Sequence, residues 1–311
     1  MVQAGLFASL FIIHYNLFFM LLSIVWNADP ELFSLGALSI RWYGLLYALG
    51  FFIGITIIGK TFKHDGAPEA WLDKVFIYIV LAVIVGARLG HVFFYDWDYY
   101  SQNLGEIFMV WHGGLASHGG ALAMVLACWL LSKYMTKQNI WWLGDRLFIG
   151  SALVAGMIRI GNLMNSEIYG TPTNLPWGFV FLRGREQFCG SVNDFTACPA
   201  PSICCPQAEW LPCHPTQLYE AGAYFLLFVL LMWLYWKKDA GKYNGLLSGI
   251  GFTGVFVSRQ LIELLKNDQS AFEANMTFNM GQWLSVPFVI LGVYLIIRAL
   301  RKGQVEYHLT K

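Results

Sequence analysis

The sequence predicts an all-α integral membrane protein, a bundle of seven transmembrane helices with an eighth candidate at the N-terminus. Three observations lead to this prediction: an apolar composition, seven stretches of membrane-spanning length, and basic residues that alternate between the loops. Hydrophobic residues make up 57% of the chain and charged residues 13%, with a mean hydropathy of +0.52. A soluble globular domain carries about 25% charged residues, so this composition indicates a membrane protein. The formal net charge of +1 gives no reason to expect a nucleic-acid partner.

The membrane spans are read from apolar stretches, because a hydrocarbon core of about 30 Å takes about 20 helical residues to cross. Seven stretches meet this requirement: residues 42–61, 71–94, 115–135, 142–163, 218–236, 245–265 and 282–300. Their number and length predict the seven-helix bundle.

Basic residues follow every second span. The loops after the first, third, fifth and seventh contain Lys60, Lys63 and Lys74; Lys133, Lys137 and Arg146; Lys237, Lys238 and Lys242; and Arg298, Arg301, Lys302 and Lys311. Loop 95–114 has none, and the long loop 164–217 has only Arg183 and Arg185. Since cytoplasmic loops carry the excess of Lys and Arg, we expect a cytoplasmic C-terminus and an extracytoplasmic 164–217 loop.

Residues 4–26 form an uncharged apolar stretch that His14 and Asn16 interrupt. The stretch fits an additional helix, or a signal-like segment without the usual basic start. Alternatively, synthesis begins at Met20 and residues 1–19 are not made, which is the hypothesis we favour. We therefore divide the chain into residues 1–26, an extra apolar segment, and residues 27–311, one polytopic membrane domain.

Five of the six cysteines lie in the 164–217 loop: Cys189, Cys198, Cys204, Cys205 and Cys213. Disulfides persist outside the cytoplasm, so we expect them to crosslink this loop or a small head region, with one cysteine left over. A zinc site is the alternative, although the spacing lacks two C-x-x-C pairs. Cys128 lies within a span and is expected to pack as a small apolar residue.

Three arginines lie well inside predicted spans: Arg88, Arg159 and Arg259. A charge at membrane depth costs at least about 2.5 to 3.5 kcal/mol on insertion scales, so it normally faces a partner or a cavity and marks function. Arg159 lies in the stretch "RIGNLMNSEIYG", where Asn162 shares its helix face and Gly161 permits a close neighbour. In isolation, a hydrated helix end with a snorkelling arginine explains this stretch equally well.

Further polar residues lie near the same predicted membrane depth. In "SRQLIELLKND", Arg259 and Glu263 are four residues apart, a spacing that favours an ion pair. Alternatively, Arg159 and Arg259 together bind a phosphate, which lipid headgroups supply at this depth. In "WHGGLASHGGALA", His118 is either a packing residue or a proton carrier. The stretch "HPTQLYEA" contributes Glu220 at the start of the fifth span, together with His214, Gln217 and Tyr219.

These stretches resemble the bacterial prolipoprotein diacylglyceryl transferases over roughly residues 27–300. The pieces that carry the resemblance are "RWYGLLYALGF", "GGLASHGG", "RIGNLMNSEIYG" followed by "LPWGFVF", "HPTQLYEA", "SRQLIELLKND" and "MGQWLSVP". The resemblance implies a multi-pass enzyme of the bacterial inner membrane, with loop 164–217 in the periplasm. Its partners would be phosphatidylglycerol and prolipoprotein signal peptides with a lipobox cysteine. The diacylglyceryl group would move to the cysteine thiol, forming a thioether and releasing glycerol 1-phosphate, with no cofactor.

The resemblance also implies site residues. The expected catalytic residues are His118, Arg159 and Arg259, and the expected substrate-binding residues are Tyr43, Asn162, Glu167, Gly170, Glu220 and Glu263, with no metal. The arginines would stabilise the departing phosphate, and His118 would deprotonate the thiol. A carboxylate or water could instead remove the proton, and His118 could bind the headgroup. Lys266 stands where the family usually has arginine, and Arg41 where histidine is common.

Other function classes fit less well. Intramembrane arginines, glutamates and histidines also line transport pathways, but the chain shows no internal repeat or paired broken helices. An intramembrane serine protease of the nucleophile-elbow type would need a G-x-S-x-G motif, which is absent from the sequence. The remaining alternative is a membrane protein that binds or transports lipid without group transfer.

Overall fold

The computed structural model describes residues 23–36, 38–110, 113–184, 211–266 and 280–306. The chain forms two compact units, each assembled from three segments. Unit 1 comprises Met1–Phe51, Ala152–Val229 and Phe252–Leu291, and unit 2 comprises Phe52–Ser151, Leu230–Gly251 and Gly292–Lys311.

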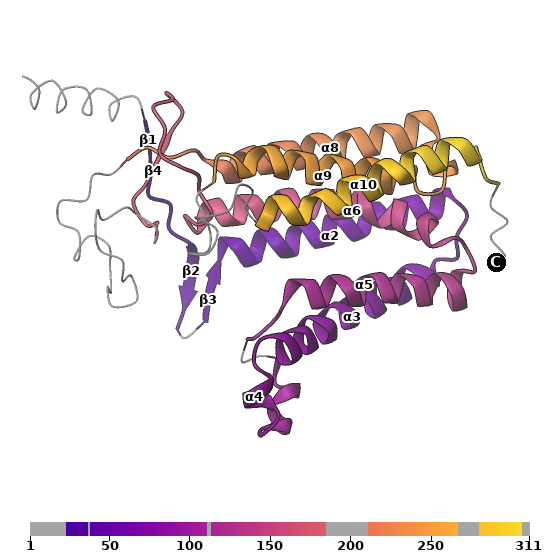
Figure 1. The fold of residues 1–311 in the computed structure, drawn as a ribbon, viewed down its shortest axis with the longest axis horizontal. Coiled ribbons are helices and arrows are strands. Elements are labelled where there is room, and N and C mark those ends of the chain that lie inside the picture. The colour runs from indigo at the N-terminus through magenta and orange to yellow at the C-terminus, as the bar shows by residue number, and fades with distance from the viewer. Residues whose placement is uncertain (1–22, 37, 111–112, 185–210, 267–279, 307–311) are drawn as a thin grey trace, which may run out of the picture. The chain divides into compact units, whose positions relative to one another are not determined.

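Helices dominate the described chain (Figure 1). The long ones are α2 (Trp42–His64), α3 (Ala70–Phe94), α5 (Ser117–Leu130), α6 (Ile140–Met164), α8 (Thr216–Lys238), α9 (Leu246–Glu263) and α10 (Met280–Lys302). A π-helical segment, η3 (Leu131–Thr136), continues α5. Short turns of helix are α4 (Trp97–Tyr100), η1 (Leu104–Phe108) and η5 (Ala240–Lys242). The long helices begin and end close to the limits predicted from the apolar stretches.

Six of these helical segments are long and apolar enough to cross a membrane: Trp42–His64, Ala70–Phe94, His118–Thr136, Ile140–Met164, Thr216–Lys238 and Gly281–Lys302. The chain is therefore a mostly helical, multi-pass membrane protein. The seventh stretch, residues 245–265, forms α9, but polar residues such as Thr253, Gln260 and Arg259 lower its hydropathy. A membrane crossing by α9 stays a prediction.

The described residues include four short strands, which were not predicted from the sequence. β1 (Ile24–Trp26) pairs in parallel with β4 (Phe179–Phe181), and β2 (Glu31–Leu35) pairs antiparallel with β3 (Leu38–Arg41). An apolar cluster of Leu163, Tyr169, Phe179, Phe181 and Cys213 packs with Trp26. The Trp26 indole N–H donates to the Leu163 carbonyl at 3.0 Å. This small module therefore connects the end of α6 with the segment before α8.

The N-terminal segment and most of the cysteine loop lie outside the described residues. Of residues 4–26, the structure describes the last few, where β1 replaces the end of the candidate helix. The four cysteines from Cys189 to Cys205 also lie outside, so the disulfides stay a prediction. Cys213 is buried and has no disulfide partner among the described residues. Burial raises the pKa of its thiol to about 11, so the thiol is protonated at neutral pH.

In unit 2, α3 and α5 lie side by side (Figure 1). Glycines permit this close approach. A Cβ on Gly119 of α5 would collide with the carbonyl oxygen of Gly86 and would lie 2.8 Å from the Cα atom of Gly90, both on α3. Small residues at a helix contact let two backbones meet, as is common in membrane proteins. The contact fixes the start of α5, which carries His118.

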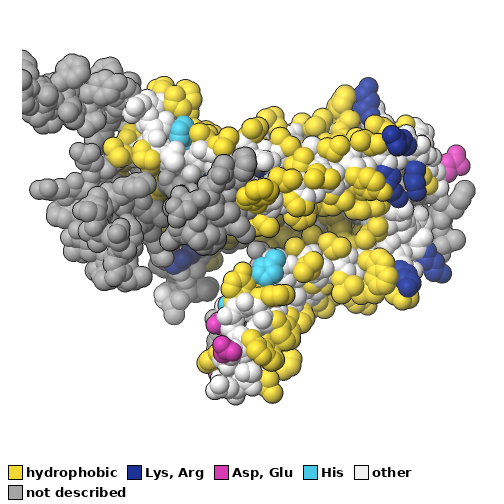
Figure 2. All heavy atoms as spheres, in the orientation of Figure 1, with side chains coloured by type: hydrophobic (Ala, Val, Ile, Leu, Met, Phe, Trp, Pro, Cys, Tyr) yellow, Lys and Arg dark blue, Asp and Glu magenta, His cyan; other side chains and the backbone are white. Residues whose placement is uncertain are grey.

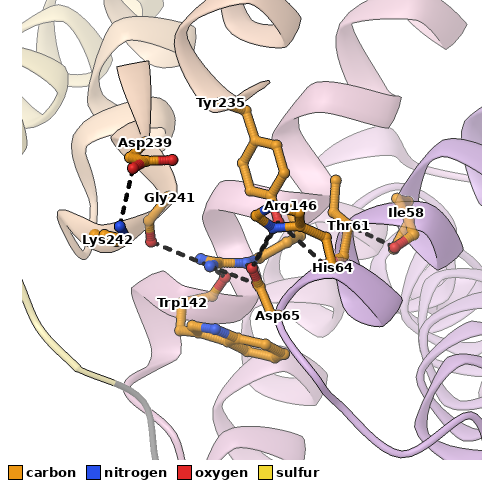
Figure 3. A network of polar contacts seen from close by, with 10 residues as sticks. All are labelled: Ile58, Thr61, His64, Asp65, Trp142, Arg146, Tyr235, Asp239, Gly241 and Lys242. Atoms are coloured by element: carbon orange, nitrogen blue, oxygen red, sulfur yellow. Dashed lines mark hydrogen bonds and ion pairs between the residues drawn. The ribbon is translucent and has the colours of Figure 1, made fainter. Parts of the chain in front are cut away.

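A buried polar network also lies in unit 2 (Figure 3). The Arg146 Nε atom donates to Asp65 Oδ2 at 2.7 Å, Nη1 donates to the Trp142 carbonyl and Nη2 to the Gly241 carbonyl. The Tyr235 hydroxyl donates to the other carboxylate oxygen of Asp65 at 2.7 Å. The prediction that Arg146 belongs to the loop after the third span is wrong, because the residue lies inside α6 and is completely buried.

The neighbouring residue, Asp145, determines where α9 begins. Its carboxylate accepts the backbone N–H groups of Gly245 at 2.8 Å and Ser248 at 2.7 Å. The first N–H groups of a helix have no hydrogen-bond partner within the helix. The Asp145 carboxylate of α6 supplies partners for two N–H groups at the start of α9 and so caps this helix. The cap contributes to fixing the helix that carries Arg259.

The surface of the helices is largely apolar, as expected of a chain in lipid (Figure 2). Basic side chains gather at one end of the face shown in Figure 2. Two helices of the chain end in basic residues, α8 in Lys237 and Lys238 and α10 in Arg301 and Lys302.

Candidate active site

Three of the sequence motifs meet at Gly170 in unit 1. The Gly170 N–H donates to the His214 carbonyl at 2.8 Å, and the Thr171 N–H donates to the Leu265 carbonyl at 2.8 Å. A Cβ on Gly170 would collide with the Leu265 carbonyl oxygen and lie 2.7 Å from the Thr216 side chain. Only glycine fits at this junction, which joins the segments after α6, before α8 and after α9. Gly170 therefore fixes the geometry of the surrounding site.

A cluster of buried charges lies beside this junction, and we refer to Arg159, Glu220, Lys266, Glu263 and Arg259 as the charged cluster. Arg159 Nε lies 3.0 Å from Glu220 Oε2, and Lys266 Nζ lies 2.9 Å from Glu220 Oε1. Lys266 also approaches Glu263 Oε2 at 3.4 Å, and Arg259 Nε lies 4.0 Å from the same oxygen. The predicted Arg259–Glu263 pairing is confirmed, although the contact is long. The five side chains form one continuous series of opposite charges.

The anions of the charged cluster are more deeply buried than its arginines. The side chains of Glu220 and Glu263 are 0% and 4% exposed, whereas those of Arg159 and Arg259 are 19% and 36% exposed. The Arg259 Nε atom is buried and has no hydrogen-bond partner among the described residues, with Glu263 Oε2 4.0 Å away. The two arginine side chains are thus partly open to a ligand, while the carboxylates hold them in place. Such a pair of guanidinium groups suits a phosphate.

The Glu167 carboxylate is held by amides at the end of α6. Its Oε1 atom accepts from Asn162 Nδ2 at 2.8 Å and from Asn165 Nδ2 at 3.1 Å. Asn162 also lies beside Arg159, whose Nη1 atom donates to Asn162 Oδ1 at 3.4 Å. The helix face shared by Arg159 and Asn162 is therefore confirmed. Glu167 itself is exposed.

Tyr43, at the start of α2, reaches the same region through Gly161. A Cβ on Gly161 would lie 2.8 Å from Tyr43 Cδ2. The expectation that Gly161 permits a close neighbour is confirmed, and the neighbour is a predicted site residue. The motif "MGQWLSVP" reaches unit 1 in the same way, because a Cβ on Gly281 would lie 2.9 Å from the Glu263 carboxylate. Together with the motifs of Tyr43, Arg159, Glu220 and Arg259, five motifs therefore contribute to unit 1.

The expected site residues did not include three side chains that lie in this region. Gln217 is fully buried, and its amide donates to the Glu167 carbonyl at 2.7 Å. Tyr224 lies one turn beyond Glu220 on α8 and is buried. Lys266 was noticed only as a departure from the family, and it bridges two glutamates. Helical spacing from Glu220 was the available signal for Tyr224.

His118 belongs to unit 2 and lies at the start of α5. It is exposed, and its described neighbours are the rings of Phe94 at 5.5 Å and Tyr95 at 5.6 Å. The motif that carries it is thus positioned by the glycine contact between α3 and α5.

Arg88, the third intramembrane arginine, is buried in unit 2, and its hydrogen bonds within the described chain go to backbone carbonyls. Its Nε atom donates to Ile107 at 2.9 Å, Nη1 to Gly113 at 2.7 Å and Nη2 to Glu106 at 2.6 Å. A further contact to Gly114 at 3.4 Å occupies Nη1. Arg88 therefore organises the segment that leads into α5 and offers little to a ligand.

Comparison with known proteins identifies the family. The family model "Prolipoprotein diacylglyceryl transferase" matches residues 30–298. A relative from Porphyromonas gingivalis, named phosphatidylglycerol–prolipoprotein diacylglyceryl transferase, is 46% identical over 89% of this chain and 95% of its own length. Relatives with the same name from Chloroherpeton thalassium and Tolumonas auensis are 42% and 41% identical over 91% and 88% of this chain, and over 97% and 96% of their own lengths. The chain belongs to the prolipoprotein diacylglyceryl transferase family.

Proposed function

We propose that this chain transfers the diacylglyceryl group of phosphatidylglycerol to the thiol of the lipobox cysteine of a prolipoprotein. The products are a thioether-linked prolipoprotein and glycerol 1-phosphate. Membership of the family supports this reaction, as do the names of relatives that are 41–46% identical over most of the chain.

One observation carries the chemical proposal: buried glutamates hold two arginines that remain partly exposed. The Glu220 and Glu263 carboxylates neutralise part of the charge of Arg159 and Arg259 but leave guanidinium N–H groups accessible. The phosphate ester of the lipid headgroup binds at these groups. As the carbon–oxygen bond to phosphate breaks, negative charge gathers on the leaving group, and the arginines stabilise it.

The thiol must lose its proton, because the thiolate is the nucleophile. His118 accepts this proton as the sulfur attacks the glycerol carbon. A carbon–sulfur bond forms, the carbon–oxygen bond breaks, and glycerol 1-phosphate leaves with the electron pair. The exposed position of His118 at the start of α5 supports this role, since a base needs access to the substrate.

The remaining site residues bind or position. Glu220 and Glu263 orient the arginines, and Tyr43 and Asn162 donate hydrogen bonds to glycerol or ester oxygens. Asn162 holds Glu167, and Gly170 keeps the three surrounding segments in register.

The proposed location is the bacterial inner membrane, with the C-terminus in the cytoplasm and the active site near the periplasmic face. The basic residues in the last turns of α8 and α10 support this orientation, because Lys and Arg favour the cytoplasmic side.

The deciding experiment supplies purified protein with phosphatidylglycerol and a lipobox peptide and follows the mass of the peptide. We expect a gain of one diacylglyceryl group on the cysteine. A peptide with serine in place of that cysteine is the matched control and should gain nothing. Folded protein that yields no product would refute group transfer and leave lipid binding or transport.

A further inference from the structure

A polar cavity of about 730 Å³ lies in unit 1 beside Glu167. Its lining includes Asp29, Glu31, Arg41, Ser166, Glu167 and Arg183. These residues come from the segments before α2 and after α6, outside the helices long and apolar enough to cross a membrane. The volume falls within the range of about 300–1,000 Å³ that is usual for ligand pockets. Such a cavity suits a polar ligand rather than the acyl chains of a lipid.

Two residues that line the cavity have a buried side-chain atom without a partner among the described residues. Ser166 is 2% exposed, and its hydroxyl has no hydrogen-bond partner among the described residues. The side-chain oxygen of Asn165, which also lines the cavity, is likewise unpartnered. A buried polar group without a partner destabilises a protein, so its retention points to a ligand.

The backbone at this point is held in an uncommon conformation. Ser166 has a φ of 55° and Ile168 a φ of 60°, on either side of Glu167. Residues other than glycine rarely adopt this left-handed region, and such conformations concentrate at ligand-binding positions. Contacts from α8 stabilise the turn, since Thr216 donates to the Ile168 carbonyl at 2.8 Å.

The charges on the cavity wall indicate which ligand fits. Three carboxylates, those of Asp29, Glu31 and Glu167, face two guanidinium groups, which leaves one net negative charge. Both arginines are already paired, Arg183 with Asp29 at 3.1 Å and Arg41 with Glu31 at 3.8 Å. A phosphate would be repelled, whereas a neutral or cationic group with N–H donors would be attracted. The cavity thus differs in chemistry from the charged cluster.

We propose that this cavity binds the polar segment of the prolipoprotein that follows the acceptor cysteine. The inference rests on the proposed function, which supplies a peptide substrate with an apolar side and a polar side. Peptide N–H groups would satisfy Ser166, Asn165 and Glu167, while the lipid phosphate binds Arg159 and Arg259. Recognition of the two substrates would then involve different residues of unit 1.

The first test separates peptide binding from lipid binding. Ser166→Ala should raise the KM for a lipobox peptide about fivefold, as expected for one lost hydrogen bond, while the KM for phosphatidylglycerol stays within about twofold. The Tm should not fall, because the variant removes an unpartnered group. Ser39→Ala, an exposed serine of β3, is the matched control. An unchanged peptide KM, or a rise confined to the lipid KM, would overturn the proposal.

A second test uses the net charge of the cavity. A peptide with lysines after the cysteine should have a KM several-fold below that of the matched peptide with aspartates, by about three- to tenfold for one favourable charge contact. Replacing Asp29 by Asn and Glu31 by Gln together leaves one carboxylate facing two guanidinium groups, so the preference should reverse. Equal KM values for the two peptides in the wild-type protein would contradict the assignment.

Binding without turnover separates the two proposals. A fluorescent peptide with serine at the acceptor position cannot react, so its anisotropy reports binding alone. Weaker binding to Ser166→Ala than to Ser39→Ala would support the cavity even if no transfer were found. Transfer by the wild-type protein with equal peptide binding to both variants would refute the cavity and leave the enzyme reaction standing.

Discussion

The charged cluster of unit 1 and the Asp65–Arg146 network of unit 2 both hold arginines inside helices, but they differ in what the arginines leave available. Arg146 is fully buried, and all three of its nitrogen atoms donate to protein acceptors. In the charged cluster the glutamates are buried, and the arginines remain partly exposed. Arg146 is buried and donates from each nitrogen atom to the protein, which indicates a structural role. In the charged cluster, buried glutamates hold partly exposed arginines, which indicates a site where the arginines bind a second anion.

The largest effect is expected at the accessible arginines. Arg159→Ala and Arg259→Ala should each lower transfer by about 10³-fold, because each removes charge stabilisation of the leaving phosphate. The Tm should fall less than in Arg146→Ala, because Lys266 still contacts both buried glutamates, so transfer is expressed per folded molecule. Turnover with phosphatidylglycerol and a lipobox peptide is the measurement. Near-normal activity in either variant would remove the proposed phosphate contact.

At Arg146 we expect a loss of stability with little loss of activity. Arg146→Ala leaves the Asp65 carboxylate buried without its cation, which should destabilise the protein by about 3–5 kcal/mol. Activity per folded molecule should remain close to wild type. Thermal unfolding together with activity normalised to folded protein gives both quantities. An unchanged Tm would contradict the structural role, and the apolar double variant Asp65→Leu, Arg146→Met should recover part of the loss.

His118 tests whether the proposed base lies in unit 2. His118→Gln should lower kcat by about 10²-fold, since glutamine can form a hydrogen bond but cannot accept the proton. The dependence of kcat on pH is the measurement, and its shape should change in the variant. A variant that keeps the wild-type pH profile would assign the proton to another group or to water.

Arg88 is an intermediate case, buried like Arg146 but bonded only to carbonyls of the segment that leads to His118. Arg88→Gln should lower kcat about tenfold and leave the lipid KM unchanged, because a misplaced base slows the chemical step. Gly114→Ala should act similarly, since its Cβ would lie 2.8 Å from Arg88 Nη1. Gly105→Ala has open space around the new methyl group and serves as the control. A change in lipid KM alone would point to headgroup binding.

The sequence predicted local features of the site and missed distant ones. Helical periodicity placed Arg159 beside Asn162, and apolar length located the helices closely. The sequence alone could not show that Lys266 contacts Glu220, 46 positions away, or that Arg146 pairs with Asp65, 81 positions away. Such pairs depend on how the helices pack, and the local sequence around a residue does not indicate a partner that is distant along the chain. The short strands were missed because three to five residues show too little periodicity.

The smallest effect is expected at Lys266, which connects the two glutamates of the charged cluster. Lys266→Arg keeps the positive charge between Glu220 and Glu263, and the planar guanidinium can donate to both carboxylates. Transfer should therefore stay within about threefold of wild type, because the arginines that contact phosphate keep their partners. Lys266→Met is the contrasting variant, since it leaves two buried carboxylates with one cation fewer. Loss of activity in both variants alike would mean that the ammonium group itself is required, and that the charged cluster needs the compact shape of lysine as well as its charge.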